Sequence, residues 1–160
     1  HRFPFKSSMT LIGSEIGAMG MGIPGGIAAA LRFPDRQVFS IVGDGGALMT
    51  GSELATAVAQ NANIRVIVAN NQHYGTIRYH QEVHFPTRDH YATNLVNPDF
   101  AKYGESFGLR CFTIEKIEEI SPAIQESMEV NGPSLIEFKM SLELNTSTTT
   151  ISQLQANKNN

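Results

Sequence analysis

Hydrophobic and polar positions along the chain predict strands and helices in alternation. Short apolar runs rich in β-branched residues indicate buried strands at 37–42, 64–70, 110–113 and 134–140. The spacing of apolar residues predicts helices from about Ile23 to residue 32, over 52–62, over 97–108 and over 117–130. We expect Ser52 or Thr50 to cap the second helix, and the glycines of the first to lie close to another element.

This order of elements predicts an α/β fold, a three-layer α/β/α sandwich with a mainly parallel sheet. Residues 13–144 would form the folded domain. We expect residues 1–12 to be a linker or the cut end of a longer chain, and residues 145–160 to be a loose polar tail. In such sheets ligands bind at the carboxyl ends of the strands, so candidate chemistry is sought there.

Composition narrows the functional classes. The chain has 160 residues, a net charge of −3 and no basic stripe, so neither a nucleic-acid partner nor a membrane partner is expected. No apolar run reaches the length of about 18 residues that a membrane span needs. Cys111 is the one cysteine, which excludes an internal disulfide and predicts a buried structural thiol in a cytoplasmic protein.

Two polar signals follow two neighbouring predicted strands. Asp44 lies just after the strand at 37–42, and Asn71 lies just after the strand at 64–70. The helix between them returns the chain to the opposite edge of the sheet, and the second strand brings it back, so both residues reach the same edge. Carboxylate and amide oxygens are hard ligands that suit Mg²⁺ or Ca²⁺. The sequence therefore predicts a hard cation at this edge.

The glycines around Asp44 suggest what the cation holds. Gly43, Gly45 and Gly46 would allow backbone N–H groups to approach an anion without a side chain in the way. Mg²⁺ bound by few protein oxygens commonly takes phosphate oxygens and water as further ligands. The pattern therefore predicts a metal that holds a diphosphate.

The segment "GDG", followed by "NN" after 24 intervening residues, resembles the fingerprint of thiamine diphosphate enzymes. More narrowly, the chain resembles the C-terminal diphosphate-binding domain of acetolactate synthase-like enzymes. The resemblance runs from about Gly13 to the "TTTISQL" tail, and it includes the segments "GAMGMGIPGGIAAALRFPDRQV", "ELATAV", "YGTIR" and "NPDFAKYGESFG".

The resemblance implies a set of cofactor contacts. Mg²⁺ would be bound by Asp44, Asn71 and the backbone carbonyl of His73, whose imidazole would then not be a ligand. Met19 would wedge the cofactor into a V shape, and the carbonyl of Gly17 would accept a hydrogen bond from the cofactor's amino group. Without the resemblance, Met19 would be interpreted as a core methionine. The diphosphate would lie against backbone amides of the segments that contain Gly43, Gly45, Gly46, Tyr74, Gly75 and Thr76.

The resemblance also implies an activity that this chain does not complete. The expected enzyme decarboxylates a 2-oxo acid and transfers the resulting carbanion. Its activating glutamate would lie on a separate pyrimidine-binding domain of the same protein or of a partner subunit, because neither Glu15 nor Glu53 matches that position. We therefore expect the chain to be inactive alone and the active site to form in a homodimer or homotetramer.

Alternatives remain at the level of the reaction. His80 stands where biosynthetic acetolactate synthases carry a tryptophan, so a 2-oxo-acid decarboxylase of the benzoylformate or pyruvate type stays open. So do a non-catalytic diphosphate-binding module and a truncated chain that binds nothing tightly. His80, His84 and Arg88 are candidates for substrate contacts. "HQEVH" lacks the glutamate that the zinc motif HExxH requires.

Overall fold

A computed structural model of the chain describes residues 11–13, 16–85, 88–143 and 149–156. Glu15 and the first ten residues lie outside this part. The elements in chain order are α1 (Gly22–Arg32), β1 (Val38–Gly43), α2 (Asp44–Thr50), η1 (Gly51–Glu53), α3 (Leu54–Ala59), β2 (Ile64–Asn70), α4 (Gly75–His84), α5 (Phe100–Glu105), β3 (Arg110–Ile114), η2 (Ile117–Glu119), α6 (Ile120–Glu129), β4 (Ser134–Lys139) and α7 (Ile151–Ala156).

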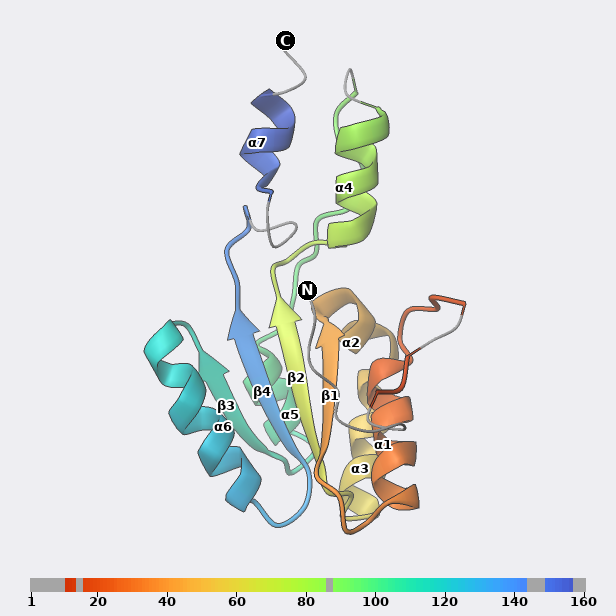
Figure 1. Cartoon of the computed structure of the whole chain (residues 1–160), viewed down its shortest axis with the longest axis vertical. Coiled ribbons are helices and arrows are strands. Elements are labelled where there is room, and N and C mark those ends of the chain that lie inside the picture. Colours follow the sequence, from red (N-terminus) through yellow and green to blue (C-terminus); the bar gives the residue numbers. More distant parts are fainter. Residues whose placement is uncertain (1–10, 14–15, 86–87, 144–148, 157–160) are drawn as a thin grey trace.

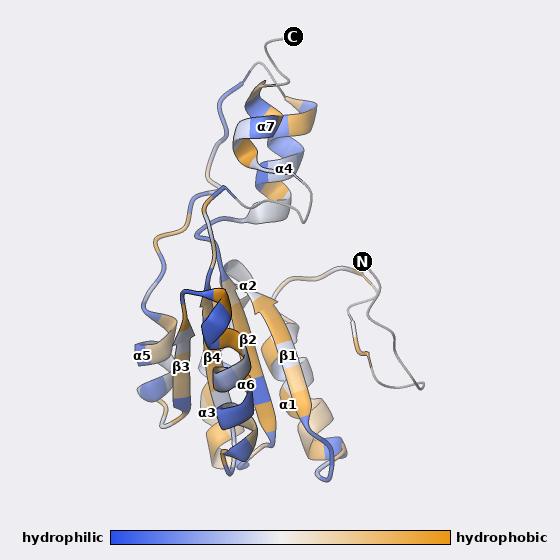
Figure 2. Cartoon of the chain, turned by 60° about the vertical axis from the view of Figure 1, so that its left-hand side comes forward, coloured by the Kyte–Doolittle hydropathy of each residue, from blue (hydrophilic) through white to orange (hydrophobic). Residues whose placement is uncertain are grey.

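The four strands form one parallel sheet in the order β1-β2-β4-β3. Helices α1, α3 and α5 cover one face, and α6 covers the other face over β3 and β4 (Figure 1). This arrangement confirms the predicted α/β fold with helices on both faces of a parallel sheet. Along β1 the apolar side chains of Phe39 and Ile41 remain exposed, in alternation with Ser40 and Val42, which face α1. Figure 2 shows this strand coloured mainly as hydrophobic.

Helix α1 approaches the sheet closely because glycine faces it. A Cβ at Gly26 would lie 2.7 Å from Cδ1 of Ile64 and 2.9 Å from Cβ of Ser40, so no larger residue fits without displacing the helix or the strands. A Cβ at Gly22 would lie 3.1 Å from Cβ of Val42. The expectation that glycines of this helix lie against another element is confirmed.

Two helices differ in extent from the sequence prediction. The helix predicted over 52–62 is present but shorter, as α3 at Leu54–Ala59 after a 3₁₀ turn at Gly51–Glu53. The chain is also helical directly from Asp44, and this helix, α2, was not predicted. Neither predicted cap is used: the Thr50 hydroxyl donates to the carbonyl of Gly20 at 2.7 Å instead. The helix predicted over 97–108 begins only at Phe100, after Asp99, whose side chain accepts from Lys102 N at 3.0 Å.

Within the predicted polar tail, residues Ile151–Ala156 form helix α7. The Ser152 hydroxyl donates to Glu143 at 2.7 Å and its backbone N–H donates to the same oxygen at 2.9 Å, which anchors the start of the helix. Helices α4 and α7 stand side by side beyond the carboxyl ends of the strands (Figure 1). Within the described residues, no helix has the length and apolarity to cross a bilayer.

Candidate functional site

The two signature segments meet at the carboxyl edge of the sheet. Gly43, at the end of β1, is the register partner of Ala69 in β2. Asp44 begins α2 directly after that pair, Asn70 ends the neighbouring strand β2, and Asn71 follows it. The prediction that both segments reach one edge is confirmed.

Asp44 is a buried acid with both oxygens already oriented. Only 2% of its surface is exposed. Its Oδ1 accepts the backbone N–H of Gly45 at 2.8 Å, and its Oδ2 accepts from Nδ2 of Asn97 at 2.7 Å. Each oxygen keeps a further lone pair, so the carboxylate can still bind a cation.

The hydrogen bonds continue from Asp44 into the sheet. Nδ2 of Asn97 also donates to Oδ1 of Asn70 at 2.8 Å, and Nδ2 of Asn70 donates to Oε1 of Glu137 at 2.7 Å. Glu137 lies in the central strand β4 and is 1% exposed. We call these four side chains the edge row: Glu137, Asn70, Asn97 and Asp44. Sequence reasoning missed three of its members, although an acid inside an otherwise apolar strand is a signal that could have found Glu137.

Asn71 and His73 form the turn beside the edge row. Oδ1 of Asn71 accepts the backbone N–H of His73 at 3.3 Å, and Nδ1 of His73 lies 2.8 Å from the carbonyl of Asn71. A carbonyl only accepts, so this contact requires the proton on Nδ1. The imidazole therefore folds back on its own turn, as suits a residue that would offer its carbonyl rather than its ring to a metal.

The start of α4 supplies a second set of backbone groups. The N–H of Tyr74 donates to the carbonyl of Thr93 at 2.8 Å, so in this structure it has an internal partner. The first N–H groups of a helix lack intrahelical acceptors, and Gly75 and Thr76 occupy these positions in α4. The Tyr74 ring packs against Gly45, where a Cβ would overlap the ring edge, so Gly45 serves close packing as well as any anion contact.

The loop before α1 lies beside α2. A Cβ at Gly46 would lie 3.7 Å from the backbone N of Gly20, which places the two segments in contact. Gly17 has φ +67°, a backbone conformation that glycine adopts readily. Met19 is 49% exposed, so the interpretation as a core methionine is wrong for this structure. The loop that contains Gly17 and Met19 thus borders the edge that contains Asp44.

Helix α4 carries the remaining candidates away from the sheet (Figure 1). His80 and His84 are exposed and their rings stack at 5.5 Å between centroids. Arg88 follows the helix and is exposed too. Among the described residues, no hydrogen bond or ion pair joins these three side chains to the edge row.

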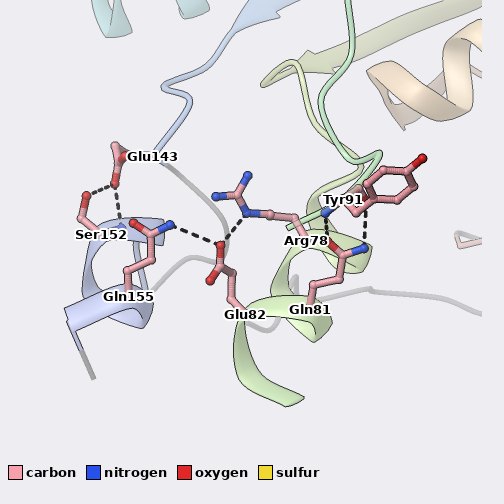
Figure 3. A network of polar contacts seen from close by, with 7 residues as sticks. All are labelled: Arg78, Gln81, Glu82, Tyr91, Glu143, Ser152 and Gln155. Atoms are coloured by element: carbon pink, nitrogen blue, oxygen red, sulfur yellow. Dashed lines mark hydrogen bonds and ion pairs between the residues drawn. The ribbon is translucent and has the colours of Figure 1, made fainter. Parts of the chain in front are cut away.

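On its buried side, α4 is held by a polar network (Figure 3). Nε of Arg78 donates to Oε1 of Glu82 at 2.8 Å, and both side chains are buried. Gln155 of α7 donates to the same oxygen at 3.3 Å, while Gln81 bonds the backbone of Tyr91 in both directions. The network fixes α4 between α7 and the segment that leads to Asn97.

The oxygens at the sheet edge fit a hard divalent cation. Asp44, Asn71 and the carbonyl of His73 offer the oxygen ligands that Mg²⁺ prefers. Within the described ranges, two acceptors nearby are buried without a hydrogen-bond partner, Oε2 of Glu137 and Oδ1 of Asn97. Both residues line a cavity of about 170 Å³ with Asn70 and Lys139. In the described part of the chain, no three histidine, cysteine, aspartate or glutamate side chains gather as a metal cluster would require.

Comparisons with known proteins agree on one family. Residues 1–138 match the family described as "Thiamine pyrophosphate enzyme, C-terminal TPP binding domain". The chain is 36% identical over 133 residues to the "Putative thiamine pyrophosphate-containing protein YdaP" of Bacillus subtilis, covering 83% of this chain and 23% of that protein. It is 32% identical over 125 residues to the mitochondrial acetolactate synthase catalytic subunit of Saccharomyces cerevisiae, covering 78% of this chain and 18% of that protein.

Among solved structures, the thiamine diphosphate-dependent 4-hydroxybenzoylformate decarboxylase of Rhodococcus jostii RHA1 is similar with a TM-score of 0.74 and 28% identity. The match covers 79% of this chain and 24% of that one. The chain thus spans about a quarter or less of the length of each of these relatives.

Proposed function

We propose that this chain, which belongs to the thiamine pyrophosphate enzymes as their C-terminal cofactor-binding domain, holds Mg²⁺ and the diphosphate of that cofactor at the carboxyl edge of its sheet. Thiamine pyrophosphate and thiamine diphosphate are the same molecule. The observation that carries the proposal is the buried carboxylate of Asp44 beside the Asn71–His73 turn, on one edge of a parallel sheet.

Each residue has a defined task in this proposal. Asp44, the Asn71 side chain and the carbonyl of His73 bind the metal. The N–H groups of Gly75 and Thr76 at the start of α4 face the diphosphate, where the helix dipole also favours negative charge. Apart from its chain neighbours, no described residue comes within 4 Å of the position that a Cβ of Gly43 would take, which leaves space for the cofactor to approach the backbone.

The loop before α1 would take the organic part of the cofactor. Met19 exposes a flexible apolar side chain next to α2 and is proposed to pack under the rings of the cofactor. The carbonyl of Gly17 is proposed to accept from the amino group of its pyrimidine. When bound, the cofactor supplies the electron sink for decarboxylation of a 2-oxo acid, and the protein supplies orientation.

The reaction we favour is transfer of the carbanion from a 2-oxo acid to an acceptor, as in acetolactate synthases. Its support is the similarity to the yeast acetolactate synthase catalytic subunit. A 2-oxo-acid decarboxylase is the second candidate, because the similar solved structure is a decarboxylase of 4-hydroxybenzoylformate. Product analysis with the full-length protein separates the two reactions. A carbanion transferase would convert pyruvate into acetolactate, and a decarboxylase would convert an aromatic 2-oxo acid into an aldehyde.

The site needs a second domain in this proposal. The loop before α1 and helix α2 carry exposed apolar side chains, which are Ile16, Met19, Leu48 and Met49. They would be covered by a pyrimidine-binding domain of the same protein or of a partner subunit in a homodimer or homotetramer. That domain would bring the activating glutamate. A cytoplasmic location belongs to the same proposal, since Cys111 is a free thiol.

The test is calorimetry of thiamine diphosphate binding with and without Mg²⁺, on this chain and on the full-length protein that carries it. We expect Mg²⁺-dependent binding to the full-length protein and weaker binding to the chain, which offers part of the contacts. Asp44→Asn should weaken binding at least about 100-fold, because even partners of metal ligands are worth 10–100-fold.

Asp35→Asn is the matched control, since Asp35 is an exposed aspartate in a turn. It should leave the affinity unchanged. Equal binding by the wild-type protein and Asp44→Asn would overturn the proposed metal site. Preference for an adenine dinucleotide over thiamine diphosphate would favour a non-catalytic nucleotide-binding module, and no binding by a folded full-length protein would favour a chain that has lost the function.

A further inference from the structure

The edge row joins four separate parts of the chain through side chains alone. Glu137 comes from β4, Asn70 from the end of β2, Asn97 from the segment before α5, and Asp44 from the start of α2. The three links measure 2.7, 2.8 and 2.7 Å between donor and acceptor. Glu137, Asn70 and Asp44 are buried, at 1%, 7% and 2% exposure. A mostly buried polar row of this kind costs folding free energy wherever one of its groups lacks a hydrogen-bond partner.

Glu137, at one end of the edge row, determines which groups of the row donate hydrogen bonds and which accept them. A carboxylate only accepts hydrogen bonds, so Glu137 requires the NH₂ of Asn70 to point toward it. The oxygen of Asn70 then points away, toward Asn97, and demands a donor there. The NH₂ group of Asn97 is this donor, and it also donates to Oδ2 of Asp44. The orientation of the Asp44 carboxylate is thus fixed from β4.

Asn70 passes the same constraint to the neighbouring turn. Its Oδ1 also accepts the backbone N–H of Gln72 at 3.3 Å, within the turn that presents Asn71 and the carbonyl of His73. Gln72 has φ +58°, so this turn depends on contacts that hold it in place. One side chain in β4 is therefore linked to all three proposed metal ligands.

The row also accumulates negative charge that nothing within it offsets. It holds two carboxyl groups and two neutral amides, and among the described residues Oε2 of Glu137 and Oδ1 of Asn97 are buried acceptors without a donor. The nearby Lys139 forms its ion pair with Glu115 at 2.8 Å, so it offsets the charge of Glu137 only in part, through a longer-range attraction. Buried negative charge is expensive by itself and becomes favourable when a divalent cation binds beside it.

We propose that Glu137 is a positioning residue for the metal: through Asn70 and Asn97 it orients Asp44 and the Asn71–His73 turn, and its charge raises the affinity for a divalent cation. This inference rests on the proposed function, because it takes Asp44 as a metal ligand. Glu137 itself does not contact the metal or the cofactor in the proposal.

The test uses Glu137→Gln in the full-length protein. The variant keeps the shape, removes the charge and allows the amide to donate to Asn70 as well as accept from it. Binding of Mn²⁺, a paramagnetic substitute for Mg²⁺, is followed by electron paramagnetic resonance at saturating thiamine diphosphate. We expect the Kd for Mn²⁺ to rise about 10–100-fold, the range found for outer partners of metal ligands.

A second readout separates positioning from a structural role. In EDTA, without metal, the melting temperature of Glu137→Gln should equal or exceed that of the wild type, because an uncompensated buried charge has been removed. A merely structural Glu137 would give the reverse, a lower melting temperature with an unchanged Kd. Glu126→Gln is the control, since it makes the same change at an exposed ion pair on α6 and should alter neither value.

Asn97→Ala interrupts the edge row at a second place, because it removes the amide that links Asn70 to Asp44. Asn97 is only half buried, so this variant should fold even if Glu137→Gln does not. It should raise the Kd for Mn²⁺ by about 10-fold or more. A Kd within twofold of the wild type in whichever of the two variants folds would overturn the inference. If Asp44→Asn still abolishes binding in that case, the proposed function survives; if it does not, both fail.

Discussion

The two ends of strand β2 solve the burial of a polar side chain in different ways. At its amino end Arg65 is 1% exposed and donates to backbone carbonyls, at 2.6 Å to Gly132 and at 2.8 Å to Val130, with further contacts to Ile64 and Met128. At its carboxyl end the Asn70 side chain bonds the side chains of Glu137 and Asn97 and the backbone N–H of Gln72 in the turn that follows.

The partners explain what each end can do. Backbone carbonyls at the end of α6 are present whatever side chains stand there. The guanidinium of Arg65 therefore holds that helix end against the sheet through groups that do not vary. Burial lowers the pKa of Arg65, yet its ordinary value is so high that the charge persists. Side-chain partners can shift when a ligand arrives. The amino end therefore secures the fold, and the carboxyl end is available for function.

The largest expected effect concerns the amino end. Arg65→Met should destabilise the protein by about 3 kcal/mol, because the carbonyls at the end of α6 lose their donor inside the core. Urea unfolding measures this change. Arg110→Met, at an exposed ion pair, should change the stability far less, because solvent screens that pair. If Arg65→Met weakened Mg²⁺ affinity without affecting stability, the division between the two ends would be wrong.

Two neighbouring glycines of α1 give a sharper test of close packing under the sheet. Gly26→Ala should cost about 1–2 kcal/mol, because its Cβ would meet Ile64 and Ser40 within 2.9 Å. Gly25→Ala should stabilise by up to about 1 kcal/mol, since its nearest neighbour is Met21 at 3.5 Å and alanine favours a helix. Equal effects in thermal unfolding would show that α1 is not pressed against β1 and β2.

Beyond the carboxyl edge, the α7 contact should depend on pH. Hydrogen bonds from the Ser152 hydroxyl and backbone lower the pKa of Glu143 below its usual range. A lowered pKa means that the contribution is present above the ordinary glutamate pKa and is lost as the pH falls through the lowered value. An NMR titration of the Glu143 carboxyl checks the direction. Ser152→Ala should return the pKa toward the usual value, and an unchanged pKa would contradict this contact.

The smallest expected effect is the low reactivity of the Cys111 thiol. The thiol is half buried against α5, and burial raises its pKa to about 11. At pH 8 roughly one molecule in a thousand would carry a thiolate, so alkylation by iodoacetamide should be slow and should accelerate as the pH approaches 11. Fast labelling at pH 8 in the folded protein would contradict the packing of β3 against α5. The predicted structural thiol is thus half buried rather than fully buried.

The sequence could predict the sheet better than the edge row, for a physical reason. The strand predicted at 64–70 has the observed bounds, because its apolar run is continuous and both faces are covered. Helix α2 was missed, since Asp44, Gly45 and Gly46 have low helix propensity and only tertiary packing against Tyr74 and Val42 holds them helical.

The edge row depends on contacts between residues far apart in the chain. Asn97 and Asp44 are 53 positions apart, and Asn70 and Glu137 are 67 apart. Periodicity says nothing about such pairs. It did place Asp44 and the "NN" segment at one edge, since that follows from strand direction alone. Asn97 was interpreted as the start of a helix that begins three residues later.

The measurement that tests the central claim most directly is a crystal structure of the full-length protein grown with thiamine diphosphate and Mn²⁺, with data collected at the manganese absorption edge. We predict one anomalous peak within coordination distance, about 2.2 Å, of an Asp44 oxygen, of Oδ1 of Asn71 and of the His73 carbonyl. Cofactor bound with the peak elsewhere, or with no peak near Asp44, would contradict the proposed site.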